Sequence, residues 1–355
     1  MVEEAPKVRA CHLCRGILDN VSPSRHNGGD NMKALCFRGF GGPEVLRVET
    51  LPDPSLTPGH ALVRMKAIGL NFADVYRRRG HYHLAGEPPY IAGYEGAGVI
   101  EAIADGGLRP LKVGDRVAFA DSPFANAELT SVPLDKLIPL PEDIDFELAA
   151  ALLLQGLTAQ YLTRDSHPVR PGEALLVHAA AGGVGLLLIQ IAKLSGARVL
   201  GVTSSPEKRA AALDASADAV ALYSEDWVEK ARLFGPHERG VDVAYDSVGS
   251  TLSQSFAAVR VGGHVVFYGM AGGDPAPVDP RMLMDTSKSL TGGDLWNVLC
   301  TSEARVSRAE QLFSWVREAR LRVRIAGRFP LSEGSKAHAF LESRAAIGKV
   351  LLIPS

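Results

Sequence analysis

Short apolar runs alternate with amphipathic segments throughout the second half of the chain. The apolar runs lie at residues 175–178, 197–202, 219–223, 241–248 and 264–269. This alternation predicts β-strands joined by helices, an arrangement that forms a doubly wound parallel sheet in α/β proteins. We expect the sixth strand of that sheet at 289–295.

The first half of the chain has a different pattern. Residues 32–140 contain short β-like runs separated by Gly and Pro, for example at 60–70, 96–104 and 114–120. Many short strands separated by turn residues predict a mostly antiparallel, barrel-like domain.

Two helical segments and a final strand complete the pattern. Residues 146–164 carry apolar side chains on one helical face and are expected to bridge the two regions. Residues 306–319 form a second amphipathic helix. The apolar tail at 349–354 is similar in style to the first region, so we expect the chain to return there.

A glycine-rich turn follows the first strand of the second region. Its residues are Ala180, Ala181, Gly182, Gly183, Val184 and Gly185. A helix begins in this turn and is expected to be capped by Gly196. Glycines let the turn close tightly and let a pyrophosphate approach the backbone, and the free N–H groups of the helix then bind phosphate. We therefore expect a dinucleotide site here; the alternative is a tight turn without a ligand.

The residues after the second strand favour NADPH over NADH. An NAD site usually places Asp or Glu at this strand end, whereas this chain has Thr203, Ser204 and Ser205, followed by Lys208 and Arg209. Hydroxyls and cations suit a 2′-phosphate, which a carboxylate would repel. The alternative reading is that residues 204–207 only cap the next helix, with the cations facing solvent.

Composition and charge exclude several classes of protein. Hydrophobic residues make up 46% of the 355 positions, and Lys+Arg 38 against Asp+Glu 40 gives a net charge of −2. Nothing here favours nucleic acid or a membrane as a partner. The cysteine count of 4 suits a reducing compartment, and we expect a cytoplasmic protein.

The first 31 residues mix charges and turn formers without periodicity, and we expect a disordered extension. Cys11, His12 and Cys14 invite a zinc interpretation, but a tetrahedral site needs more ligands than this segment offers. Neither Cys36 nor Cys300 belongs to a second pair of cysteines.

Several motifs together are similar to those of one known family. They are GGPEVLRV (41–48), GLNFADVYRRRG (69–80), GYEGAGVI (93–100), LKVGDRVAF (111–119), LLQGLTAQYL (153–162), HAAAGGVGLLLIQIAK (178–193) and LESRAAIGKVLLIP (341–354). On these residues the chain resembles the zinc-free quinone oxidoreductase (zeta-crystallin-like) branch of the medium-chain dehydrogenase/reductase superfamily.

The resemblance implies two domains. We expect a GroES-like catalytic domain from residues 32–155 and 299–355, and a Rossmann NADPH-binding domain from residues 156–298. Relatives pair as homodimers through the edge strands of their nucleotide-binding sheets, which correspond to 289–295 here.

Zinc-dependent relatives carry ligands that this chain lacks. They place a His within Gly-His-Glu, where this chain reads Gly93-Tyr94-Glu95, and a catalytic Cys near the position of Asn71. We therefore expect no zinc and a structural role for Glu95, as the partner of a nearby cation. We also expect no flavin.

The resemblance also implies specific site residues. In the family, a Lys, a Tyr and an Arg hold the 2′-phosphate, and these positions correspond to Lys208, Tyr223 and Arg344. Each also has a plain reading as a solvated or packed residue. Family pattern adds cofactor contacts after the fourth and fifth strands, at Ser247, Tyr268 and Gly269, to those expected from the hydroxyls of Thr203, Ser204 and Ser205 themselves.

The resemblance places Asn71, Tyr76, Gln155 and Thr158 around the nicotinamide and substrate. Asn71 and Thr158 would bond the carboxamide or ribose, and Tyr76 would donate a hydrogen bond or proton to the acceptor oxygen. The alternatives are turn chemistry for Asn71 and ordinary packing for the others.

The resulting hypothesis is NADPH-dependent reduction of a small-molecule acceptor, with a quinone favoured. An alternative is reduction of activated C=C bonds in enals, enones or enoyl thioesters, for which Arg77, Arg78 and Arg79 would meet CoA phosphates unless they form a solvated helix face. An alternative of another class is a non-catalytic crystallin-like or RNA-binding role.

Overall fold

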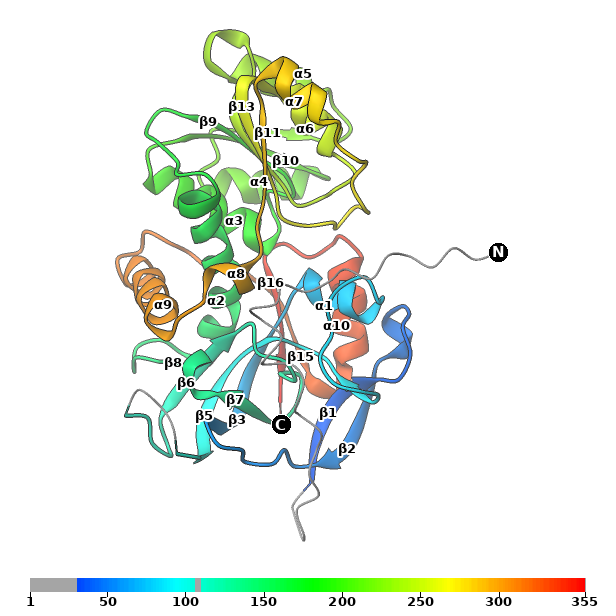
Figure 1. Ribbon diagram of the computed structural model, residues 1–355, viewed down its shortest axis with the longest axis vertical. Helices are drawn as coiled ribbons and strands as arrows, with labels where there is room; N and C mark the ends of the chain where they lie inside the picture. Colours follow the sequence, from blue (N-terminus) through cyan, green and yellow to red (C-terminus); the bar gives the residue numbers. More distant parts are fainter. Residues whose placement is uncertain (1–30, 106–109, 355) are drawn as a thin grey trace.

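The computed structural model describes residues 31–105 and 110–354, which fold into two lobes joined by a central helix (Figure 1). Among these residues no helix is both long and apolar enough to cross a bilayer. The expected extension over residues 1–31 lies outside the described residues, except that Asn31 begins the first strand. The Cys11–Cys14 motif lies outside them as well.

The lower lobe contains the predicted antiparallel strands. A three-stranded sheet has the order β2 (Arg47–Pro52), β1 (Asn31–Phe37), β4 (Tyr90–Ile91). A larger sheet has the order β15 (Ile325–Pro330), β16 (Lys349–Ile353), β3 (His60–Leu70), β5 (Glu95–Ile103), β6 (Arg116–Ala120), β8 (Ile138–Pro139), and β7 (Leu129–Pro133) pairs with β3. All these pairs except β15 with β16 are antiparallel, which confirms the barrel-like GroES-type domain.

The upper lobe is the predicted doubly wound sheet. Its strands are all parallel, in the order β11 (Ala219–Leu222), β10 (Arg198–Thr203), β9 (Ala174–Val177), β12 (Val241–Asp246), β13 (Val259–Phe267), β14 (Ser289–Gly292). The helices that connect them are α3 (Gly183–Leu194), α4 (Pro206–Asp214), α5 (Trp227–Phe234), α6 (Leu252–Ala258) and α7 (Pro280–Thr286). This strand order is that of dinucleotide-binding folds, whose ligands bind at the carboxyl ends of the strands.

The sixth strand is shorter than the sequence predicts. It ends at Gly292 because the Asp294 side chain accepts a hydrogen bond from the Trp296 N–H and caps the short helix α8 (Leu295–Val298). The predicted C-terminal helix is α9 (Ser302–Arg317), and the predicted glycine cap is present, since Gly196 has φ +81° just after α3.

Helix α2 (Phe146–Tyr161) lies between the lobes and ends in a π-helical turn, Leu162–Ser166 (Figure 1). Its N-cap Asp145 accepts a hydrogen bond from the Leu148 N–H at 2.7 Å. One hydrophobic core includes Leu152 and Leu157 of α2 together with residues of both lobes, so the lobes share a single packed interior. The predicted boundary between residues 155 and 156 falls inside this continuous helix and stays a prediction.

The C-terminal segment returns to the lower lobe as expected. Strand β16 pairs antiparallel with β3, with Leu351 opposite Gly69. Before it come α1 (Phe72–Arg78), which follows β3, and α10 (Gly334–Glu342), which precedes β16. The 3₁₀ turns are Pro43–Val45, Leu134–Lys136, Pro236–Glu238 and Leu331–Glu333. The return brings residues 348 and 349 beside the glycine-rich turn of the upper lobe.

Candidate cofactor and acceptor site

The N-terminus of α3 presents an open anion-binding end. Its N-cap is Gly182, and no side chain caps it and no acidic residue lies in its first turn. Among the described residues, the backbone N–H groups of Gly183, Val184 and Gly185 have no hydrogen-bond partner outside the helix. A Cβ on Gly185 would lie 2.5 Å from the Ala179 carbonyl oxygen, so only glycine fits there. The predicted dinucleotide turn therefore has the required shape.

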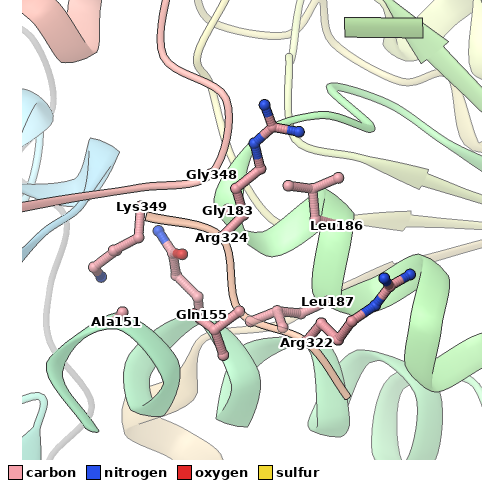
Figure 2. Close-up of a pocket in the computed structure, with 10 residues that line it drawn as sticks. Ala151, Gln155, Gly183, Leu186, Leu187, Arg322, Arg324, Gly348 and Lys349 are labelled. Atoms are coloured by element: carbon pink, nitrogen blue, oxygen red, sulfur yellow. The ribbon is translucent and has the colours of Figure 1, made fainter. Parts of the chain in front are cut away.

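The C-terminal segment clamps this turn from the other lobe. The Gly348 N–H donates to the Ala181 carbonyl oxygen at 3.1 Å, and Gly348 forms an isolated parallel bridge with Gly182. A recess of at most 190 Å³ opens beside the turn, smaller than an ordinary ligand pocket (Figure 2). Gln155 lines it and lies so close to Gly183 that a Cβ there would be 1.9 Å from Gln155 Oε1.

Lys208 lies in the first turn of α4, just after β10, and Arg344 is within electrostatic reach of it. Partial burial lowers the pKa of Lys208, and the nearby Arg344 cation lowers it further. Ser205 caps α4, accepting a hydrogen bond from the Lys208 N–H at 3.3 Å, so the capping interpretation is correct for this serine. Thr203 is buried and its Oγ1 has no partner among the described residues, whereas Ser204 is exposed. Two adjacent cations with an unpaired hydroxyl suit a phosphate group.

The Tyr223 hydroxyl faces the glycine-rich turn. It accepts a hydrogen bond from the Ala179 N–H at 3.0 Å and lies 3.1 Å from His178 Nδ1. Burial raises the pKa of Tyr223, while the Arg344 cation lowers it, which places Arg344 within electrostatic reach. The predicted trio therefore meets at one edge of the sheet, although in this structure the Tyr223 hydroxyl bonds the protein.

The loops after β12 and β13 are held by Asp246, which is fully buried. Its carboxylate accepts hydrogen bonds from the Val248 N–H at 2.9 Å, the Gly249 N–H at 3.0 Å, Thr251 Oγ1 at 2.8 Å and Ser255 Oγ at 2.6 Å. Burial alone raises its pKa, but His178 and these hydrogen bonds outweigh burial and lower it.

The predicted positions in these loops lie together at the carboxyl edge of the sheet. The Tyr268 N–H donates to the Asp246 carbonyl oxygen at 2.9 Å. A Cβ on Gly269 would lie 3.1 Å from the Ser247 carbonyl oxygen, so the two loops touch there. This is the edge at which parallel sheets of this order bind ligands.

A buried polar network connects Asn71 to the C-terminal strand. Lys349 Nζ donates to Asn71 Oδ1 at 2.9 Å and forms a closer ion pair with Glu95, both partners of that pair being about 1% exposed or less. Asn71 Nδ2 donates to Glu95 Oε2 at 2.9 Å, and Gln155 Nε2 donates to Asn71 Oδ1 at 3.2 Å. The expected pairing of Glu95 with a cation is confirmed. Both polar groups of the Asn71 amide are thus engaged with protein atoms.

Sequence reasoning missed Lys349. A lysine at the first position of an otherwise apolar strand was the available signal, because a buried cation requires a buried anion. Its long separation from Glu95 along the chain hides that partner in the sequence.

Tyr76 connects α1 to the loop after β13. Its hydroxyl oxygen accepts a hydrogen bond from the Met270 N–H at 3.0 Å. Burial raises the pKa of Tyr76 to about 12, although this hydrogen bond opposes the rise. Thr158 donates to the Leu154 carbonyl oxygen at 2.7 Å, as the packing alternative for this residue implies. The Thr158 hydroxyl proton is therefore taken by a backbone carbonyl, whereas the Tyr76 hydroxyl proton has no acceptor among the described residues.

An aromatic cluster beside Tyr76 was not predicted from the sequence. The Tyr76 and Tyr82 rings lie 6.4 Å apart, and the Tyr94 and Trp296 rings lie 5.5 Å apart. The Arg77 guanidinium lies 3.4 Å from the centroid of the Tyr94 ring. Tyr82 also hydrogen-bonds Asp294, so this cluster joins the two lobes.

The interpretation of Arg77, Arg78 and Arg79 as a phosphate-facing patch is wrong, and so is the solvated-face alternative for the first two. Arg77 is 3% exposed and Arg78 is fully buried. Arg77 pairs with Asp74 at 3.4 Å, and both Arg78 and Arg79 pair with Glu342. Arg77 and Arg78 are therefore buried in ion pairs, and the exposed Arg79 shares the Glu342 carboxylate with Arg78.

The residues present do not fit a zinc ion. Among the described residues, no group of three or more His, Cys, Asp or Glu side chains is arranged to hold a metal. Tyr94 lies under Arg77, and its hydroxyl accepts a hydrogen bond from the Ala85 N–H at 3.1 Å, while Glu95 is paired with Lys349.

Comparison with known proteins agrees with this architecture. The family model described as "Alcohol dehydrogenase GroES-like domain" matches residues 57–168, and that described as "Zinc-binding dehydrogenase" matches residues 183–313. A quinone oxidoreductase of Pseudomonas aeruginosa is 40% identical over 325 residues, covering 91% of this chain and 99% of the relative. A 2-haloacrylate reductase of Burkholderia is 36% identical, covering 88% of this chain and 96% of the relative.

Solved structures give the same result. The Escherichia coli quinone oxidoreductase complexed with NADPH has a TM-score of 0.87 at 36% identity, covering 91% of this chain and 100% of that chain. With the fold, the glycine-rich turn and the identity over nearly the whole relative in agreement, this chain belongs to the quinone oxidoreductase family of medium-chain dehydrogenases/reductases.

Proposed function

We propose that this protein is an NADPH-dependent, zinc-free reductase whose acceptor is a quinone. The observation that carries the proposal is the open N-terminus of α3 beside a strand end without a carboxylate, with Lys208 and Arg344 within electrostatic reach of each other. Relatives named quinone oxidoreductase, one with NADPH bound, support the same conclusion.

The proposed cofactor site uses residues of both lobes. Lys208, Arg344 and Tyr223 would take the 2′-phosphate, and the turn Ala181–Gly185 would take the pyrophosphate. The remaining proposed contacts are Asn71, Gln155, Thr158, Thr203, Ser204, Ser205, Ser247, Tyr268 and Gly269. The proposed domains are residues 32–155 with 299–355, and 156–298.

When bound, NADPH supplies a hydride from C4 of its nicotinamide. The chain supplies Tyr76, whose hydroxyl oxygen accepts from Met270 while its own proton has no acceptor among the described residues. That proton is available to an acceptor oxygen. A quinone that receives one hydride and one proton becomes a hydroquinone, which balances the reaction. Because the aromatic ring stabilises the product oxyanion, such an acceptor needs little acid catalysis.

Reduction of an activated C=C bond is the second candidate. The 36% identity to a 2-haloacrylate reductase favours it, and the same cofactor site would serve it. Arg77 and Arg78 are buried and paired, so the Arg77–Arg79 run gives little support to a CoA thioester as the substrate. A non-catalytic role has no such support.

Assembly and location are also proposals. The strand β14 lies at the open edge of the six-stranded sheet, with Ser289 and Leu290 exposed, which suits a homodimer formed through that edge. A cytoplasmic location rests on composition alone.

The test is loss of NADPH absorbance with purified protein, using an ortho-quinone, a para-quinone, 2-chloroacrylate and crotonyl-CoA, each repeated with NADH. We expect quinone turnover with a strong preference for NADPH. Turnover of 2-chloroacrylate alone would replace the acceptor assignment, and turnover with NADH alone would contradict the cofactor assignment.

A further inference from the structure

Arg324 lies beside the glycine-rich turn and has no partner for its charge within residues 31–105 and 110–354. It lies with Arg322 on the segment that precedes β15, and both line the recess next to Gly183 (Figure 2). Arg322 Nη2 donates to the Asp214 carbonyl oxygen at 2.8 Å. The Gln190 side chain accepts a hydrogen bond from the Arg322 backbone N–H and donates one to the Arg322 carbonyl oxygen. The exposed Arg324 side chain has no hydrogen bond or ion pair among the described residues.

The backbone of Arg324 is nevertheless held firmly. Its carbonyl oxygen accepts a hydrogen bond from the Lys349 N–H at 2.8 Å. Gly348 has φ +96°, and a Cβ there would lie 2.2 Å from the Arg324 carbonyl oxygen and 3.1 Å from its Cβ. Since Gly348 also donates to Ala181, one residue joins Arg324 to the turn. The base of the side chain is therefore fixed relative to the α3 N-terminus.

The Arg324 guanidinium points away from Lys349 and Gln155 (Figure 2). Two further observations point to a polar ligand beside the turn. Gln155 is 8% exposed, and its Oε1 lines the recess without a partner among the described residues, so it can accept from a donor group of the ligand, such as a hydroxyl, although it cannot bind the phosphate itself. The N–H groups of Gly183–Gly185 are also without partners outside the helix, as described above.

We propose that Arg324 binds the pyrophosphate of the dinucleotide, a contact that rests on the proposed function. A pyrophosphate carries two negative charges, and the neighbouring Lys349 cannot neutralise them because Glu95 already pairs with it. A guanidinium can donate two parallel hydrogen bonds to phosphate oxygens. This role differs from that of Lys208 and Arg344, which distinguish NADPH from NADH.

A pyrophosphate contact by Arg324 and a 2′-phosphate contact by Lys208 predict different changes in ligand affinity, which can be measured without turnover. Titration calorimetry of Arg324→Gln with NADPH, NADH and 2′-AMP tests them. We expect Kd to rise about tenfold for both dinucleotides, as for loss of one charge-assisted contact, and to stay unchanged for 2′-AMP, which has no pyrophosphate. Lys208→Gln should instead weaken NADPH and 2′-AMP and leave NADH unchanged.

Arg322→Gln is the matched control, because its guanidinium already bonds Asp214, and it should bind all three ligands like the wild type. Arg324→Lys keeps the charge and should recover part of the lost affinity, which separates a phosphate contact from a folding defect. Equal Kd values for Arg324→Gln and wild type would overturn the proposal, as would an effect confined to NADPH.

The outcome is separable from that of the proposed activity. If the dinucleotides bind and respond to Arg324→Gln while no quinone is reduced, the assigned acceptor is wrong and the Arg324 contact stands. If wild-type protein binds neither dinucleotide, both proposals are overturned.

Discussion

The hydroxyl oxygen of Tyr76 lies 3.0 Å from the backbone nitrogen of Met270, a hydrogen bond across 194 residues of sequence. Tyr76 belongs to α1 of the lower lobe, and Met270 follows β13 of the upper lobe. The bond therefore joins the lobes at the carboxyl edge of the parallel sheet, where ligands bind in this fold. It leaves the phenolic proton without an acceptor among the described residues.

Replacing Tyr76 with Phe tests whether that proton is used. We expect kcat to fall by about a hundredfold for a C=C acceptor, whose carbanion-like product needs a proton, and by much less for a quinone. Because burial raises the pKa of Tyr76 to about 12, its protonated form persists and should cause no loss of rate up to pH 10.

Steady-state kinetics of Tyr76→Phe with both acceptor types, across pH, gives the measurement. The control is Tyr161→Phe, whose hydroxyl donates to the Gly293 carbonyl oxygen rather than facing Met270. Unchanged kcat for both acceptors in Tyr76→Phe would exclude a proton-donor role.

The preference for NADPH should depend on Lys208 and Arg344. Replacing either with Ala removes one cation from a close pair, and we expect the Kd of NADPH to rise about tenfold or more while that of NADH changes little. Fluorescence titration measures both constants. Arg209→Ala is the control, because Arg209 already pairs with Glu225 at 2.6 Å. Equal weakening of NADPH and NADH would contradict a 2′-phosphate role.

The buried pair of Lys349 and Glu95 should be costly to break on one side only. Lys349→Met leaves the Glu95 carboxylate buried without its cation, and we expect a loss of about 3 to 5 kcal/mol in the free energy of unfolding. The double variant Glu95→Gln/Lys349→Met removes both charges and should recover much of that loss. Urea unfolding of Lys349→Met, Glu95→Gln and the double variant measures the coupling, and additive losses would argue against a direct pair.

Two glycines of the turn should respond differently to alanine. A Cβ on Gly183 meets the end of the Gln155 side chain, whereas a Cβ on Gly185 meets backbone atoms of Ala179 and Ala180. We expect Gly183→Ala to weaken NADPH binding and to be partly rescued by Gln155→Ala, which clears the space. Gly185→Ala should not be rescued, because backbone cannot move aside. Binding and thermal unfolding of the four proteins check this, and rescue of Gly185→Ala would contradict it.

Asp246 should make stability depend on acid pH. Its folded-state pKa is lowered, so its contribution is fully present above pH 3.8 and is lost as the pH falls through the folded value. His178, whose pKa burial lowers, adds a loss as the pH falls below 6.5. Asp246→Asn should reduce stability at neutral pH by about 1 to 3 kcal/mol and flatten the acid limb.

Urea midpoints between neutral and acid pH measure that limb. Asp285→Asn, a change at an exposed carboxylate, is the matched control and should follow the wild type. A parallel acid limb in Asp246→Asn and wild type would show that the carboxylate does not contribute.

Local patterns determined most of the architecture before any contact was known. Apolar runs separated by helical segments specified the parallel sheet, and the strand, glycine turn and helix around Gly182 specified a dinucleotide turn, because each depends on neighbouring residues. The helix caps at Ser205 and Gly196 could be predicted from the sequence for the same reason. The end of β14 was not, since Asp294 caps a helix where apolar residues suggested more strand.

The charged interior was decided only by tertiary structure. Nothing near Lys349 in the sequence indicates that it is buried against Glu95, 254 residues away, and the Arg77–Arg79 run has the composition of a solvated face. Likewise, the hydrogen bond between Tyr76 and Met270 and the position of Arg324 beside the glycine-rich turn depend on the pairing of β16 with β3, which brings the lobes together. Burial and pairing of charges depend on which distant elements pack together, and short-range periodicity carries no information about that choice.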